Sequence, residues 1–402
     1  MADRTILHCD CNSYYASVEL LSHPELKEKP VAVCGDPESR HGIILAKNEP
    51  AKRMGVKTAE TIWQAQRKCP GLVLLPAHHD QYQYYYEKIN NIYLSVTDQV
   101  EAFSIDESWL DVTGSYNLFG DGQTIADHLR RRVREELGLT ISVGVSFNKT
   151  LAKMGSDFKK PDATTCLTRE NFKALLYPLP VGEMLFIGPA AEKILIAHGI
   201  QTIGHLAQCP PQTLTALLGK TGENFHLWAN GIDDSPVRRW GEKEPVKSIG
   251  NGMTFRADLK GEEQWKQGLI PLCEQVGARL RSHHLKCQTL AVQVKDPQFK
   301  VFSRQMKMNP PTNLTRSLIE GSLALMNALW KKDAPVRMLT VTASNLMDAD
   351  APVYEQLDLL NPVKSANPKQ ARLEKAIDQV RARYGRGAVN ISTVLGGEED
   401  PQ

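Results

Sequence analysis

The 402-residue chain has no uninterrupted apolar run near eighteen residues, the length that a membrane-spanning helix needs. It also shows no N-terminal signal pattern, so we expect neither export nor a membrane partner. Its eight cysteines include no CxxC pair, and Cys9 and Cys11 alternate across a strand end rather than forming a zinc knuckle. Reduced thiols of this kind fit a cytoplasmic protein best.

A strong net charge is also missing. The formal charge of +2 does not by itself indicate a nucleic-acid partner, but the distribution is more informative. Between Trp240 and Asn345 the chain has sixteen Lys and Arg against nine Asp and Glu. There is no tandem repeat or low-complexity tract, and a chain of this length with 42% hydrophobic residues can form about two to four globular domains.

Two adjacent acids, Asp106 and Glu107, lie between strand-like apolar runs in the stretch 104–108. Asp10 ends a third such run. If these strands lie side by side, three carboxylates converge, and each pair about 4 Å apart repels by roughly 4 kcal/mol at an effective dielectric near 20. Such a cluster needs protons or metal. Two hard divalent cations could also activate an attacking oxygen and stabilise a leaving pyrophosphate. An exposed acidic hairpin turn is the plainer alternative.

The first half of the chain alternates strand and helix patterns. After Asp10, Asn12 or Ser13 can cap a helix that ends near His23. The alternation of strands and helices along this half of the chain suits a split βαβ sheet with helices on one face. Further strands are expected at 31–35, 42–46, 73–75 and 141–146, and helices at 48–54, 61–69, 80–95, 123–136 and 148–159.

From Asn171 onward the pattern becomes helical, with glycine turns at Gly188 and around Lys220. Short helices about such turns can present backbone N–H groups to a DNA phosphate without reading bases. A plain helical bundle is equally compatible with the pattern.

A charged, breaker-rich segment at 236–245 predicts a linker, and a second βαββαβ pattern with the positive excess follows it. Any one of its cations is ordinarily part of a solvated face, but four of them are candidate phosphate contacts: Lys247, Arg256, Arg304 and Lys307. The expected elements are strands at 248–255, 289–294, 300–306 and 336–344, and helices at 262–280 and 314–330. A further charged helix is expected at 368–384.

In this order, several of these motifs resemble those of the Y-family translesion DNA polymerases, closest to the bacterial polymerase IV branch. The resemblance covers about residues 1–345. It rests on Asp10, Asn12, YYASVE at 14–19, SIDE at 104–107, GVS at 144–146, LAK at 151–153 and Lys160-Pro161.

The resemblance implies an α+β right-hand polymerase with a ferredoxin-like palm, small fingers, a helix-hairpin-helix thumb and a βαββαβ little finger. By this correspondence the palm comprises 1–33 and 78–165, the fingers 34–77, the thumb 166–238, the linker 239–246, the little finger 247–346 and the tail 347–402.

The resemblance also implies the chemistry, which is low-fidelity synthesis from dNTPs on a primer-template. Asp10, Asp106 and Glu107, with the carbonyl of Cys11, would hold two Mg²⁺ ions or Mn²⁺ in their place. The primer 3′-hydroxyl would attack the α-phosphate, and no protein nucleophile is required. Proofreading is not expected, because no second acid cluster is present.

The expected nucleotide contacts include Tyr15, which matches the aromatic that collides with a ribonucleotide 2′-hydroxyl and thus acts as a steric gate. Glu49 departs from the family pattern, since many members have a tyrosine there, and Lys47 is a candidate substitute. The full set of contacts carried over is Tyr14, Tyr15, Ile44, Lys52 and Lys160, with Ile43 and Leu45 flanking Ile44.

Five residues of the tail resemble the peptide with which bacterial polymerases bind their sliding clamp: Gln356, Leu357, Asp358, Leu359 and Leu360. The expected partners are therefore primer-template DNA, dNTPs and the clamp, and the protein is expected to be a monomer. Two rival functions are a nucleotidyl cyclase on a palm-like fold and a catalytically silent DNA- and clamp-binding factor.

Overall fold

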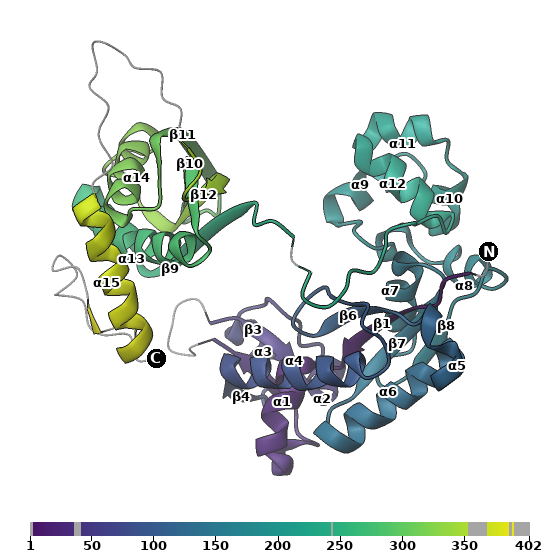
Figure 1. The fold of residues 1–402 in the computed structure, drawn as a ribbon. Coiled ribbons are helices and arrows are strands. Elements are labelled where there is room, and N and C mark those ends of the chain that lie inside the picture. The colour runs from purple at the N-terminus through teal and green to yellow at the C-terminus, as the bar shows by residue number, and fades with distance from the viewer. Residues whose placement is uncertain (1–2, 36–41, 243, 353–367, 386–387, 390–402) are drawn as a thin grey trace. The chain divides into compact units, whose positions relative to one another are not determined.

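The computed structural model describes residues 3–35, 42–242, 244–352, 368–385 and 388–389 (Figure 1). The chain divides into two compact units, Met1–Lys243 and Glu244–Gln402. The predicted clamp peptide, residues 356–360, lies outside the described residues. Within the described part, no helix is long and apolar enough to cross a membrane.

A five-stranded sheet carries the acids, with strand order β5-β6-β1-β7-β8. β1 pairs antiparallel with both β6 and β7, so the two distant acidic segments are brought together as the sequence predicts. β8, which was not predicted, runs parallel to β7. The strands are β1 (Ile6–Cys11), β5 (Val100–Ala102), β6 (Glu107–Asp111), β7 (Ile141–Ser146) and β8 (Thr164–Cys166).

Helices cover both faces of this sheet, whereas the sequence predicted one covered face. Leu7, Cys9 and Cys11 of β1 pack in the core formed with α4 (His79–Leu94) and α6 (Gly122–Leu137). The alternate residue Ile6 packs in a separate cluster with Ala152 of α7 (Lys149–Phe158). Because strand side chains alternate between faces, His8 and Asp10 lie on the α7 side.

Helix α1 (Tyr14–Ser22) leads from β1 into a small subdomain with its own core. Its sheet has the order β3-β2-β4. The Thr61 and Gln64 side chains form a capping box that begins α3. The elements are β2 (Val31–Cys34), β3 (Ile44–Lys47), β4 (Val73–Pro76), α2 (Glu49–Arg53) and α3 (Ile62–Lys68).

The helical subdomain that follows the sheet has a core of its own. Its helices are α8 (Phe172–Leu176), α9 (Pro189–Ala197), α10 (Ile203–Gln208), α11 (Pro211–Leu218) and α12 (Lys220–Ala229). Beyond α12 the chain returns to the sheet, where the Arg238 guanidinium donates to Glu101 (2.9 Å) and the Trp240 amide donates to the Asp98 carbonyl (3.1 Å). These contacts anchor the chain up to Trp240, so the first residues of the linker predicted at 236–245 are held against the sheet.

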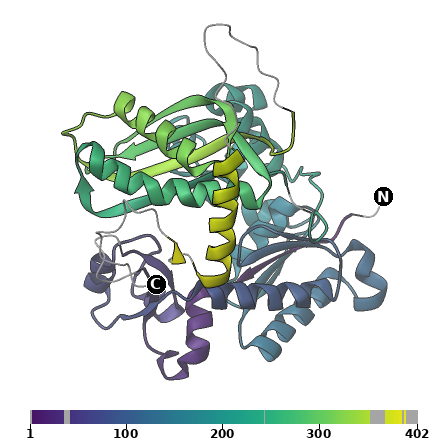
Figure 2. The same ribbon diagram turned by 60° about the vertical axis from the view of Figure 1, so that its left-hand side comes forward.

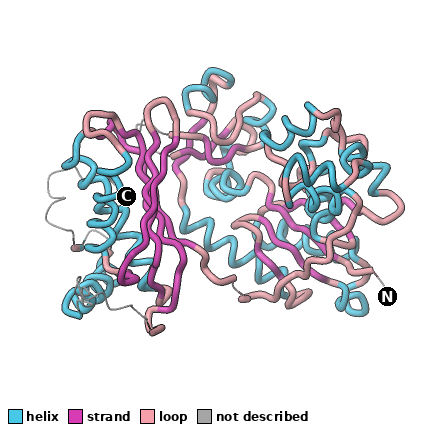
Figure 3. Tube along the Cα trace, turned by 90° about the horizontal axis from the view of Figure 1, so that it is seen from above, coloured by secondary structure: helices cyan, strands magenta, loops and turns pink. Residues whose placement is uncertain are grey.

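The second unit repeats the predicted βαββαβ order as a four-stranded sheet, β11-β10-β12-β9. Both of its long helices lie on one face of the sheet (Figure 3) and share a core with it that includes Trp265 and Leu290. The elements are β9 (Ser248–Leu259), α13 (Gly261–Ser282), β10 (Leu285–Lys295), β11 (Val301–Thr312), α14 (Thr315–Leu329) and β12 (Val336–Asp348).

The predicted helix at 368–384 is present as α15 (Pro368–Tyr384) and packs against α13 (Figure 2). Arg281 of α13 pairs with Asp378 at 2.6 Å and also contacts Glu374. Arg381 of α15 pairs with Glu274 at 2.9 Å. Ion pairs on both helices thus hold α15 to the helical layer of the second unit.

Gly144 of β7 is where α7 approaches the sheet most closely. A Cβ at this position would lie 2.0 Å from the Ala152 carbonyl oxygen and 2.4 Å from the Ser156 amide nitrogen. Backbone cannot yield as a flexible side chain can, so we expect Gly144→Ala to destabilise the first unit by about 2–3 kcal/mol, which lowers its melting temperature by about 4–10 °C.

The matched control is Gly71→Ala, because a Cβ at Gly71 meets nothing within 4 Å. This variant should melt within about 2 °C of the wild type. Equal melting temperatures for the two variants in differential scanning calorimetry would contradict the close helix-to-strand approach.

Candidate active site

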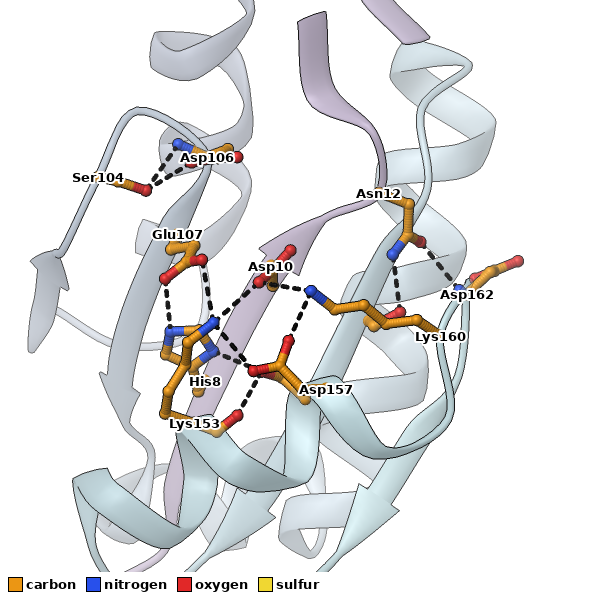
Figure 4. A network of polar contacts seen from close by, with 12 residues as sticks. His8, Asp10, Asn12, Ser104, Asp106, Glu107, Lys153, Asp157, Lys160 and Asp162 are labelled. Carbon is orange, nitrogen blue, oxygen red and sulfur yellow. Dashed lines mark hydrogen bonds and ion pairs between the residues drawn. The ribbon is translucent and has the colours of Figure 1, made fainter. Parts of the chain in front are cut away.

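The register of β1 and β6 places Asp10 directly opposite Glu107 (Figure 4). Asp106 lies just before β6, in the β5–β6 turn, and its carbonyl accepts from the Cys11 amide at 2.9 Å. The Asp106 carboxylate accepts a 2.5 Å hydrogen bond from the Ser104 hydroxyl. The three predicted acids are therefore neighbours, but Asp106 is turned toward its own loop.

Two lysines of the α7 region neutralise this acidic edge. Lys153 Nζ lies 3.1 Å from Asp10 Oδ2 and 3.0 Å from Glu107 Oε1, so one ammonium group joins β1 to β6. Lys160 Nζ lies 2.8 Å from Asp10 Oδ2 and 2.8 Å from Asp157 Oδ1. Lys160 was expected near the site, whereas the role of Lys153 was missed. The available signal was a lysine within a small and apolar helical run, because a buried charge needs a partner.

His8 is fully buried beside Glu107. The Ser156 hydroxyl donates to the Lys153 carbonyl (2.7 Å) and so accepts from His8 Nδ1–H (2.8 Å). The lone pair of His8 Nε2 then faces Glu107 Oε2 at 3.5 Å, and neither atom has a hydrogen-bond partner among the described residues. Burial, reinforced by the Lys153 charge, lowers the pKa of His8 to about 3, so the ring is neutral at pH 7.

Three other ionisable groups of the site have a raised pKa, each for its own reason. Burial raises the pKa of Asp106, and the charges of Asp10 and Glu107 add to this effect. Burial alone would lower the pKa of Lys153, but the surrounding carboxylates raise it above its ordinary value. Burial also raises the pKa of the Cys11 thiol, which stays protonated and leaves the backbone carbonyl as the ligand that this residue could offer.

The donor atoms suit a hard divalent cation. In the described part of the chain, no group of three or more Asp, Glu, His or Cys side chains is arranged so that it could hold a metal ion. Lys153 contacts Asp10, and Ser104 donates to Asp106. All the candidate donors are nonetheless oxygens, and Glu107 Oε2 is buried without a hydrogen-bond partner.

Tyr15 lies on α1, and its ring stacks on Tyr82 with centroids 3.9 Å apart and planes 9° apart. Tyr82 was not predicted as a site residue. Tyr14 is 3% exposed and its hydroxyl donates to the Tyr82 carbonyl at 2.6 Å. The Tyr14 side chain is therefore committed to packing, which does not suit the expected nucleotide contact.

Comparison with known proteins agrees with this architecture. The profile of the impB/mucB/samB family matches residues 9–157, and that of its C-terminal domain matches residues 246–359. The DNA polymerase IV of Acetivibrio thermocellus is 44% identical over 392 residues, which is 98% of each chain. The chain belongs to the DNA polymerase IV family.

Other relatives agree over similar lengths. The DNA polymerase IV of Moorella thermoacetica is 38% identical, with 98% of this chain and 97% of the relative covered. DNA polymerase IV 2 of Bacillus subtilis is 37% identical, with 97% and 94% covered. Among solved structures, a Y-family DNA polymerase chimera of Dbh and Dpo4 matches with a TM-score of 0.74 at 23% identity, covering 86% of this chain and 99% of its own, which shows the right-hand fold.

The small subdomain with sheet β3-β2-β4 lies in the part of the chain that the sequence predicts as the fingers. Its predicted triphosphate contact Lys52 is exposed and lies 3.5 Å from Glu49. Lys47, the candidate substitute, donates to the Thr58 hydroxyl at 2.9 Å. Ile44 is completely buried in the fingers core, which argues against its contact with a nucleotide, whereas Ile43 is 38% exposed.

The residues predicted to contact DNA differ in whether their side chains are exposed on a surface that DNA could reach. Gly188 caps α9, and Lys220 begins α12 with an exposed side chain. Strand alternation places Lys307, opposite Thr289, on the open face of the little-finger sheet. Arg304 pairs with buried Val292 and so lies on the helix-covered face, where its guanidinium donates to the Ala328 carbonyl at 3.4 Å.

Two further candidates lie along β9. Arg256 is exposed and follows Phe255, which packs against the core, so it lies on the open face with Lys307. Lys247 precedes the strand, is exposed and lies 3.8 Å from Glu244. Strand alternation therefore favours Arg256 and Lys307 as candidate DNA contacts on the open face and argues against Arg304 as one.

The raised pKa of Asp106 gives a stability prediction. A carboxyl group whose pKa is raised on folding stabilises the folded state while it is protonated. Its contribution to the free energy of unfolding is therefore lost as the pH rises above about 4, the ordinary pKa of an aspartate. Asp106→Asn, which is neutral at every pH, should therefore raise the melting temperature at pH 7 in EDTA. The gain should disappear near pH 4.

The matched control is Asp98→Asn, because Asp98 is exposed and lies 3.7 Å from Arg239 on the surface. It should leave the melting temperature unchanged. An Asp106→Asn melting temperature at or below that of the wild type at pH 7 would contradict the electrostatic description of the site.

Proposed function

We propose that the chain performs template-directed translesion DNA synthesis, adding dNTPs to a primer 3′-end, releasing pyrophosphate and lacking proofreading. The observation that carries the proposal is the meeting of Asp10, Asp106 and Glu107 at one sheet edge beside two lysines. The relatives named DNA polymerase IV, similar over nearly the whole chain, support the same activity.

In this proposal Asp10, Asp106, Glu107 and the Cys11 carbonyl hold two Mg²⁺ ions, or Mn²⁺ in their place. Such ions, when bound, make the primer hydroxyl a better nucleophile and offset charge on the phosphates. Lys160 exchanges its contact with Asp10 for the incoming triphosphate, because its ammonium already lies at the acid edge. The remaining catalysis is positioning, which needs no protein nucleophile.

The proposed partners follow the same division of the chain. The thumb turns at Gly188 and Lys220 and the open face of the little-finger sheet, with Arg256 and Lys307, take the backbone of the primer-template. Lys52, with Lys47 nearby, contributes to triphosphate binding from the fingers. The segment 356–360 binds the sliding clamp as a short peptide, and the polymerase acts as a monomer.

Primer extension with dNTPs and Mg²⁺ tests the proposed activity. The double variant Asp106→Ala/Glu107→Ala should lose about 1000-fold or more of the wild-type rate, because the remaining groups cannot hold the catalytic charge. Asp98→Ala, which removes an exposed acid, should extend the primer as the wild type does.

Each rival function predicts a different result in this assay. Wild-type protein that forms cyclic nucleotide without extending the primer would identify a cyclase. Binding of DNA without any extension in Mg²⁺ or Mn²⁺ would leave a DNA-binding factor. Either result would refute the proposal.

The proposed steric gate can be tested at Tyr15. Truncating the ring in Tyr15→Ala removes the surface that would collide with a 2′-hydroxyl, so discrimination between dATP and ATP in kcat/KM should fall by about 10–100-fold. Tyr15→Phe keeps the ring stacked on Tyr82 and should discriminate as the wild type does. Unchanged discrimination in Tyr15→Ala would remove the gate from this residue.

A further inference from the structure

Two half-exposed aromatic rings join the acidic turn to the first thumb turn. Phe103 immediately precedes Ser104 in the acidic turn, and Phe186 lies two residues before Gly188. The ring centroids are 6.3 Å apart in an edge-to-face arrangement with an interplanar angle of 77°. Phe103 is 45% exposed and Phe186 is 55% exposed, so each ring keeps a large part of its surface open.

Each of these two rings packs against a tryptophan. Phe103 packs on Trp109 of β6 with centroids 4.8 Å apart, and Phe186 packs on Trp228 of α12 at 5.5 Å. The four rings therefore form a continuous row from the strand that begins with Glu107 to the helix that begins with Lys220. The Phe103–Phe186 contact is edge-to-face and the two tryptophan contacts are tilted, so packed rings connect the two turns.

The backbone at Phe186 has a conformation that favours glycine. Its φ angle is +68°, in the left-handed region that glycine adopts without steric cost and a bulky residue rarely adopts. A phenylalanine kept in this conformation, with its ring mostly in solvent, is not explained by core packing. Strained positions of this kind concentrate at sites that bind or act on ligands.

We propose that Phe103 and Phe186 are positioning residues for the primer strand near its 3′-end, an inference that rests on the proposed polymerase activity. Phe103 belongs to the turn that carries Asp106, and Phe186 lies two residues before Gly188, in the turn proposed to bind a backbone phosphate. The sugar edge of a paired primer strand is apolar enough to pack on such rings, and a contact with sugars tolerates any sequence. The rings touch no reacting atom and act by holding the strand.

The test is Phe186→Gly, which removes the ring and suits the backbone. Relief of the left-handed strain offsets the lost ring contacts, so its melting temperature should stay within about 3 °C of the wild type. The Kd for primer-template, measured by fluorescence anisotropy with a non-extendable primer, should rise about 5–20-fold. The KM for primer-template should rise in parallel, while the KM for dNTP stays unchanged.

Salt dependence separates this role from phosphate binding. Phe186→Gly should leave the slope of log Kd against log salt unchanged, because no charge is lost. Lys220→Ala should reduce that slope by about one counterion. Phe186→Tyr, which restores a ring, should recover wild-type affinity.

The matched control is Phe299→Gly in the β10–β11 turn, where the phenylalanine has φ +65°, is 64% exposed and contacts Arg337. It makes the same substitution at a similar φ angle in the second unit of the chain and should keep wild-type affinity. Wild-type affinity in Phe186→Gly, or no recovery in Phe186→Tyr, would overturn the inference. Wild-type protein that binds primer-template without extending it would instead refute the polymerase activity. The anisotropy assay measures binding alone, so the two outcomes can be told apart.

Discussion

The repulsion among three carboxylates at one sheet edge is the constraint on which the site depends. Pairs of charges about 4 Å apart repel by roughly 4 kcal/mol in this kind of environment, so the arrangement requires cations. Lys153 supplies one by contacting both Asp10 and Glu107, and Lys160 supplies another at Asp10. The ammonium groups hold the ends of β1 and β6 together at the acids.

Close packing of α7 on the sheet makes this arrangement possible. Gly144 lets the helix backbone approach β7, which places Lys153 at the acids and Ser156 at His8. The serine fixes the ring of His8, and the buried neutral ring in turn borders Glu107. Gly144 on β7 therefore helps to set the orientation of Glu107, a predicted catalytic acid two strands away, since β7, β1 and β6 are adjacent in that order.

Local patterns were sufficient for much of the fold. Strand and helix order, the second βαββαβ unit and the bounds of α15 followed from the periodicity of apolar residues. The meeting of Asp10 with Glu107 followed from the motifs, because a family pattern preserves which strands are neighbours. β8 was missed because it has only three residues and carries little periodic signal.

By itself, the sequence determined the elements, the family pattern and the identity of the acids, since these depend on residue types at fixed spacing. Tertiary structure alone decided which side chains are free to act. Packing buried Ile44 and Tyr14, turned Arg304 to the helix-covered face and brought Lys153 to the acids. Alternation along a strand or helix defines two faces, but only the partner element that packs on one of them determines which face remains open to a ligand.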